Sequence, residues 1–175
     1  MIETLISSKT RVKLLMKFFL NSQNTAYLRN LEEEFGESTN AIRLELNKFE
    51  KAGLLLSSSA GNKKIFKVNI SHFFFKDLQS MVMKVVGLDQ IIDYVIKGLG
   101  DVEKVYLVGK FARGLDSEII DLVFVGRINR NYLLELVEKV ELKIKKKVRF
   151  VIFSPEEFDF KKIKEENTEP LLLWS

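Results

Sequence analysis

Apolar residues recur every three or four positions in three segments of the N-terminal third of the chain, which is the spacing of amphipathic helices. Residues that suit helix ends bound these segments, with Ser or Thr before the first and third, Gly36 after the second and Gly53 after the third. The apolar stripes are Val12, Leu15 and Phe19 in segment 7–22, Leu28, Leu31 and Phe35 in segment 25–38, and Ile42, Leu46 and Phe49 in segment 38–53. The pattern predicts three helices, the third beginning at a Ser38 or Thr39 cap.

Segment 54–69 follows as two short strands around Ala60-Gly61-Asn62, which is a hairpin signal. Three helices and then a basic hairpin form the order of elements in a winged helix-turn-helix. In that fold the third helix can enter the major groove of double-stranded DNA, and the hairpin can meet phosphates or the minor groove.

The polar face of the third predicted helix carries the candidate base-reading residues. Asn, Arg and Thr side chains near the start of such a helix can pair with base edges, and hairpin lysines can pair with phosphates. The predicted DNA-binding residues are Thr39, Asn40, Arg43, Asn47, Lys63 and Lys64. The alternatives are a merely solvated helix face or a protein-contact module, and four acidic residues make the second helix poor for phosphate contact: Glu32, Glu33, Glu34 and Glu37.

The net charge of +4 lies entirely in the first half of the chain. Residues 1–80 hold 12 Lys and Arg against 8 Asp and Glu, whereas residues 81–175 hold 16 of each. This distribution favours an anionic partner for the first half. Residues 8–70 also resemble the arsenical-repressor-like winged helices of prokaryotic regulators, so we expect a winged-helix DNA-binding domain over residues 1–70.

A phenylalanine-rich helix is predicted to link the two halves, over residues 71–87, with Ser71 as its cap. Apolar residues cover more than one side of this helix, so one face can pack on the winged helix and another on a second subunit. The alternative is a simple interdomain core. His72, the only histidine, is expected to be structural.

The second half alternates between helices and strands. Strands are predicted over 102–109, 118–126 and 148–154, and helices over 89–99 and 129–147. Ser154 and Pro155 are expected to cap a further helix over 155–166. The fold class is therefore α+β, with a winged helix, a linking helix and a C-terminal α/β domain that contains a small mixed sheet.

Residues 108–126 resemble the nucleotidyltransferase superfamily that includes DNA polymerase beta, in its minimal prokaryotic form. That signature has a Gly-Ser, an Ala-Arg-Gly turn and then Ser-Asp-hydrophobic-Asp-Leu. Gly109, Ala112, Arg113, Gly114 and Asp121 match it. Four segments in order, 73–88, 109–114, 116–126 and 148–158, are similar to a prokaryotic family that fuses a winged helix to a minimal nucleotidyltransferase domain, here expected over residues 88–175.

The departures from the signature predict that this domain is not catalytic. The resemblance implies two Asp residues at i and i+2 that hold Mg²⁺ together with a third acid on a neighbouring strand. Only Asp121 remains, because Ile119 stands two positions before it and the candidate third strand offers Arg149. Strand alternation places Glu118 on the opposite face. We therefore expect no metal site, no cofactor and no enzyme activity, with Asp121 as a remnant.

The glycine loop of this domain keeps positive character. Gly109, Lys110 and Arg113 could bind a nucleotide or another anionic effector, with Lys110 standing where the family has a phosphate-contacting Ser. The alternative is a turn that only supports the sheet.

We expect a cytoplasmic protein from the composition. It has no Cys and no apolar run long enough to span a bilayer, and its N-terminus lacks the layout of a signal peptide. We expect a homodimeric, DNA-binding transcriptional regulator that has no membrane partner. Two alternatives stay open: an active nucleotidyltransferase that uses Asp121 with Glu118 or Asp116, and a protein-interaction adaptor of a toxin-antitoxin-like pair.

Overall fold

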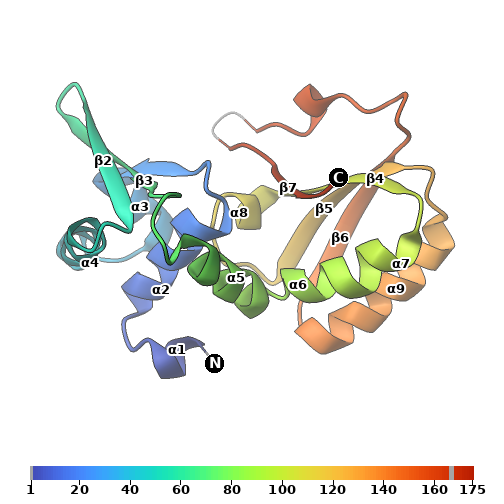
Figure 1. Ribbon diagram of the computed structural model, residues 1–175, viewed down its shortest axis with the longest axis horizontal. Coiled ribbons are helices and arrows are strands. Elements are labelled where there is room, and N and C mark those ends of the chain that lie inside the picture. The colour runs from blue at the N-terminus through green and yellow to red at the C-terminus, as the bar shows by residue number, and fades with distance from the viewer. Residues whose placement is uncertain (1, 166–167) are drawn as a thin grey trace. The chain divides into compact units, whose positions relative to one another are not determined.

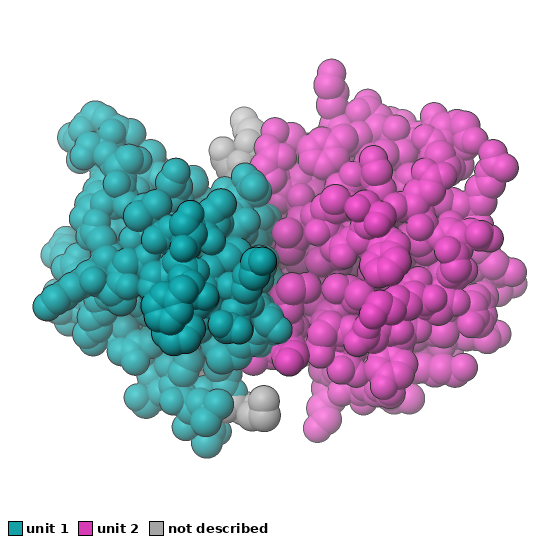
Figure 2. Space-filling model, viewed as in Figure 1, with its two compact units in different colours: residues 1–82 teal, residues 83–175 magenta. Residues whose placement is uncertain are grey.

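The computed structural model describes residues 2–165 and 168–175 and divides the chain into two units, Met1–Val82 and Met83–Ser175 (Figure 2). The division lies inside helix α5 (Phe75–Val86). Among the described residues, no helix combines the length and the apolar composition needed to cross a membrane.

Capping serines and a glycine set the ends of the helices in the first unit. The Oγ atoms of Ser8 and Ser38 each accept a backbone N–H three residues ahead, at 3.2 Å, and so cap α2 and α4. Gly36, with φ of 62°, ends α3 in the left-handed conformation that favours glycine. The elements are α1 (Ile2–Leu5), α2 (Lys9–Leu15), a π-helical continuation η1 (Met16–Leu20), α3 (Leu28–Phe35) and α4 (Thr39–Lys51). The three predicted helices are confirmed.

A three-stranded antiparallel sheet completes this unit. Strands β2 (Leu55–Ala60) and β3 (Lys63–Val68) form the predicted hairpin, with Ala60 paired to Lys63 across the turn. Strand β1 (Thr25–Tyr27), which the sequence pattern did not predict, pairs with the other side of β3 and gives the order β1-β3-β2. Figure 1 shows the hairpin extending beyond the helices of its unit.

The core of the first unit consists of the predicted helical stripes together with the inner face of the hairpin. Burying each large apolar side chain stabilises the fold by about 1.5–3 kcal/mol. The buried residues include Leu14, Phe18, Phe19, Leu31, Ile42, Leu46, Phe49, Leu55 and Phe66.

Helix α5 begins at Phe75, four residues later than the predicted cap at Ser71. The Asn69 side chain accepts the Ser71 N–H at 3.2 Å and donates to the Gly53 carbonyl at 2.8 Å. The His72 N–H donates to the Asn69 carbonyl, and the Phe75 N–H donates to the His72 carbonyl. Asn69 therefore holds a turn in which Ser71 cannot take a capping position, and the prediction of this cap was wrong.

The second unit contains a four-stranded mixed sheet in the order β6-β5-β4-β7. Strand β5 runs parallel to β6, whereas β4 is antiparallel to both β5 and β7. The strands are β4 (Val102–Val108), β5 (Ile119–Gly126), β6 (Lys147–Phe153) and β7 (Leu171–Trp174). The first three were predicted, and β7 was not.

Helices cover one face of this sheet (Figure 1). Helix α9 (Arg130–Ile144) connects β5 to β6 and packs against a continuous helical segment that precedes β4. That segment consists of α6 (Leu88–Ile91), the π-helical turn η2 (Ile92–Ile96) and α7 (Lys97–Leu99). Helix α8 (Gly109–Ala112) is a short turn between β4 and β5.

The helix predicted over residues 155–166 does not form. Its described part contains only a 3₁₀ turn, η3 (Phe160–Lys162), and Glu166 lies outside the described residues. Phe158 and Ile163 both pack on the cluster around Tyr106 and Val123, on the sheet face opposite α9. Residues five apart point in widely different directions from an α-helix, so a helix could not place both side chains on one surface. Tertiary packing overrides the local helix signal here.

Candidate functional site

A groove of about 590 Å³ lies on the first unit, between helices α3 and α4 and the hairpin. Five of the six predicted DNA-binding residues line it: Thr39, Arg43, Asn47, Lys63 and Lys64. The remaining groove residues are Tyr27, Leu28, Arg29, Glu32, Leu46, Asn62 and Phe66. Asn40 is exposed on α4 but is not among them. The structure thus brings residues from two distant segments of the sequence to one surface.

The orientation of α4 follows from its apolar stripe. Ile42, Leu46 and Phe49 are buried, and this fixes which side of the helix faces outward. Arg43 and Asn47, one turn apart, are both exposed and project from one side of the helix. Each offers side-chain donors, and Asn47 also offers an acceptor, for hydrogen bonds to base edges.

Two further groove residues, Tyr27 and Arg29, were not predicted from the sequence. Tyr27 ends β1, and its ring lies 4.5 Å from the Nζ atom of Lys63. Arg29 lies in the first turn of α3 and forms an exposed ion pair of 3.6 Å with Glu33. Tyr27 and Lys63 come together only because β1 pairs with β3, and β1 is too short to leave a periodic signal.

Two acidic residues, Glu34 of α3 and Glu37 just after it, are neutralised away from the groove. Glu34 pairs with Lys17, and Glu37 pairs with Lys13, each at 2.7 Å. The Lys17 side chain is only 6% exposed, so its pair with Glu34 also stabilises the packing of η1 on α3. Glu32 is the acidic side chain that lines the groove among the described residues, against four basic ones. Because Glu33 pairs with Arg29 and Glu50 pairs with Lys64, the groove has its positive charge mainly from Arg43 and Lys63.

Asp121 of the second unit forms an ion pair with a basic residue of the neighbouring strand. Asp121 on β5 is directly opposite Arg149 on β6, and Arg149 Nε donates to Asp121 Oδ1 at 2.5 Å. This hydrogen bond raises the pKa of Arg149 above its already high ordinary value. Gly109, with φ of 67°, lies against the same carboxylate, because a Cβ atom there would come within 2.8 Å of Asp121 Oδ2. Glycine at this position is thus required by packing as well as by conformation.

The residues around Asp121 do not fit the magnesium site that the resemblance implies. Ile119, on the same strand face as Asp121, is 38% exposed and is paired with Lys147. Glu118 lines a separate depression with Glu138 and Glu141, and Asp116 pairs with Lys146 at 3.1 Å. Within the residues that the structure describes, no cluster of three or more His, Asp or Glu side chains could hold a metal ion.

The predicted anion-binding residues share the turn that follows β4. Gly109 and Lys110 belong to α8, and the Arg113 N–H donates to the Gly109 carbonyl at 3.2 Å. Lys110 is exposed, and its carbonyl accepts the Leu115 N–H at 3.0 Å. Lys146 anchors the next part of the loop by donating to the Ser117 carbonyl at 2.8 Å. Hydrogen bonds within the loop and one from Lys146 therefore fix the path of its backbone.

Two solved structures are similar to parts of the chain. The crystal structure of AF1382 from Archaeoglobus fulgidus is 17% identical, covers 53% of this chain and 98% of its own, and aligns with a TM-score of 0.39. A "putative nucleotidyltransferase" from Sulfolobus solfataricus is 23% identical, covers 56% of this chain and 86% of its own, and aligns with a TM-score of 0.38. No protein-family model and no curated protein matches the sequence.

Proposed function

We propose that the protein is a sequence-specific, double-stranded DNA-binding regulator that uses its first unit as a winged helix. The observation that carries this proposal is the groove, which gathers the predicted recognition residues of α4 and the hairpin lysines on one cationic surface. In this proposal α4 enters the major groove, where Arg43 and Asn47 contact base edges. Lys63 of the hairpin and Arg29 contact the sugar-phosphate backbone.

The second unit is, in this proposal, a non-catalytic domain with a nucleotidyltransferase-like fold that serves in assembly or in sensing a ligand. The ion pair of Asp121 with Arg149 supports the loss of catalysis, because it occupies the one carboxylate that the signature retains. The loop with Gly109, Lys110 and Arg113 is the proposed place for a nucleotide or another anionic effector. A homodimer would present two recognition helices to a palindromic site.

The test is to select genomic DNA fragments on the purified protein and to measure nucleotide binding on the same preparation. We expect enrichment of a short, related set of duplexes, bound more tightly than a scrambled duplex of the same composition. The DNA-binding proposal is rejected if no sequence is enriched and if binding to every duplex vanishes at moderate salt.

A further inference from the structure

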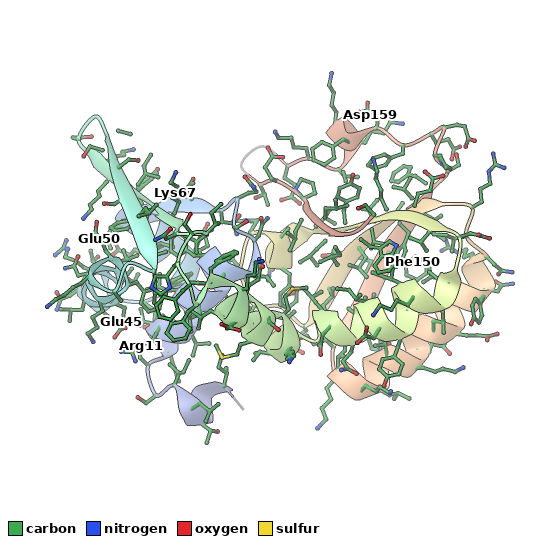
Figure 3. All side chains as sticks on the ribbon, viewed as in Figure 1. Arg11, Glu45, Glu50, Lys67, Phe150 and Asp159 are labelled. Atoms are coloured by element: carbon green, nitrogen blue, oxygen red, sulfur yellow. The ribbon has the colours of Figure 1, made fainter. Side chains whose placement is uncertain are left out.

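Glu50, near the C-terminal end of α4, is bound by both strands of the hairpin. Its Oε2 atom accepts a hydrogen bond from Lys64 Nζ of β3 at 2.7 Å, and its Oε1 atom accepts one from Ser57 Oγ of β2. Figure 3 shows Glu50 on α4 beside the hairpin. One carboxylate thus connects the helix that we assign to base recognition with the strands that carry the proposed phosphate contacts.

The strand register explains how one carboxylate reaches both strands. Ser57 is paired with Phe66, and Ser59 is paired with Lys64, so Ser57 and Lys64 lie on the same face of the hairpin. The Lys64 ammonium also lies 5.1 Å from the centroid of the Phe66 ring. The hydrogen bond from Lys64, followed by that from Ser57, lowers the pKa of Glu50. The charge of Lys64 is therefore balanced by Glu50 in an ion pair at the protein surface.

The neighbouring Lys63 is in a different situation. It points to the opposite face of the hairpin, where its Nζ atom lies over the Tyr27 ring. No acidic side chain pairs with it in the part of the chain that the structure describes. Two adjacent lysines that look equivalent in the sequence therefore differ in the charge that they can offer to a phosphate.

We propose that Glu50 is a specificity-determining residue of the DNA interface. By binding Ser57 and Lys64 it fixes the hairpin against α4, and it withdraws one cation from sequence-independent attraction to DNA. Since non-specific binding depends almost wholly on counterion release, removing a cation weakens non-specific binding more than specific binding. This inference rests on the proposed DNA-binding function of the groove.

The test compares wild type with Glu50→Gln by fluorescence anisotropy, using a selected duplex and a scrambled duplex over a range of NaCl concentrations. In the variant Lys64 becomes available to phosphates, so we expect the slope of log K against log [NaCl] to steepen by about 0.9. The ratio of specific to non-specific affinity should fall. Asp77→Asn, which removes an exposed acid from α5 of the same unit, is the charge-matched control and should change neither quantity.

Variants of the two lysines provide a second test. Lys63→Met should make the salt slope shallower by about 0.9. Lys64→Met should leave the slope unchanged if, as proposed, Glu50 already neutralises Lys64 in the wild type. Methionine retains the aliphatic stem, and circular dichroism reports whether each variant folds. Equal slopes for the two variants, or an unchanged slope for Glu50→Gln, would overturn the proposal.

A readout without DNA separates this inference from the proposed function. In the NMR titration of the Glu50 carboxyl group, Lys64→Met should raise its pKa, and hydrogen exchange of the hairpin amides should become faster. If no duplex binds but both changes occur, the DNA-binding function fails while the contact between Glu50 and the hairpin stands. An unchanged Glu50 titration shows that the contact itself is absent in solution, and the inference then fails whatever DNA binding shows.

Discussion

Arg149 and Asp121 are direct neighbours on the parallel strands β6 and β5, and the guanidinium Nε atom lies 2.5 Å from the carboxylate Oδ1 atom. The Asp121 side chain is 19% exposed, and that of Arg149 is 71% exposed. The pair therefore lies at the surface of the sheet, on the face opposite helix α9. A metal ion at this position would have to replace the guanidinium and would find one carboxylate instead of three.

The first prediction is that the protein does not transfer labelled nucleotide from any nucleoside triphosphate to itself, to nucleic acid or to a partner. Ile119→Asp alone should not restore transfer, because Arg149 still neutralises the retained Asp121. Asp121→Ala should leave DNA binding unchanged. Transfer that depends on Mg²⁺ in the wild type and disappears in Asp121→Ala would show that the second unit is an enzyme.

The geometry also predicts what a metal site would require. Ile119, Asp121 and Arg149 lie on one face of two adjacent strands, so Ile119→Asp combined with Arg149→Asp would place three carboxylates together. We expect Mn²⁺ binding, measured by electron paramagnetic resonance, in this double variant but in neither single variant. Binding by the wild type at similar affinity would contradict our account of the ion pair.

Base recognition is predicted to depend on the exposed face of α4. Arg43→Ala and Asn47→Ala should each weaken binding to a selected duplex by about 1–3 kcal/mol and relax the sequence preference at the contacted base pair. Lys51→Ala, which removes an exposed cation at the end of the same helix, is the control and should keep the sequence preference. If the Arg43 and Asn47 variants retain wild-type specificity, α4 is not the recognition helix.

Most helices and strands were predicted correctly because the residues that start and end them act locally. The Ser38 cap, the left-handed Gly36 and the Gly61-Asn62 turn each act within a few residues. Strands β1 and β7 were missed because three or four residues carry no period and acquire their conformation only by pairing with β3 and β4. The absent helix over 155–166 is the converse case, since packing of Phe158 on Tyr106 outweighs the local capping signal.

The sequence predicted several residues that line the groove, but not which of their charges are paired with another side chain. The face of α4 followed from its apolar stripe, so Arg43 and Asn47 could be chosen correctly as exposed residues. Nothing in the sequence separated Lys63 from Lys64, because the carboxylate of Glu50 reaches Lys64 across fourteen positions only after the hairpin folds. Ion pairs between distant segments require the tertiary structure.

A homodimer remains a prediction that the exposed aromatic residues near α5 support. Phe73 is 77% exposed and Phe74 is 52% exposed, and their rings lie 4.0 Å apart, centroid to centroid. Exposed aromatic clusters of this kind are often covered by a partner. Light scattering at micromolar concentration should give about twice the 20.3 kDa mass of one chain, and Phe73→Ser should shift the protein toward the monomer. A wild-type mass of 20.3 kDa would remove the expectation of a palindromic DNA site.

A nearly buried carboxylate connects α2 with α4. Glu45 of α4 is only 9% exposed, and it accepts hydrogen bonds from Arg11 Nε at 2.8 Å and from Lys48 Nζ at 3.0 Å (Figure 3). The Arg11 hydrogen bond is the largest cause that lowers the pKa of Glu45, with a smaller contribution from Lys48, while burial opposes both. The ionised form is therefore the one that the folded state prefers.

This preference predicts how stability depends on pH. Because the folded-state pKa of Glu45 is lowered, its stabilisation is complete above the ordinary glutamate pKa of about 4.3 and is lost as the pH falls through the folded-state value. Glu45→Gln should reduce the free energy of unfolding by about 1–2 kcal/mol at neutral pH, between the values for an exposed ion pair and for a buried charged hydrogen bond. Urea denaturation at a series of pH values measures this difference, which should shrink as the pH is lowered below about 4. The control Glu32→Gln changes an exposed acid of α3 and should not lower the free energy of unfolding comparably. If the loss caused by Glu45→Gln stays constant down to acid pH, lost packing and not the ion pair is its cause.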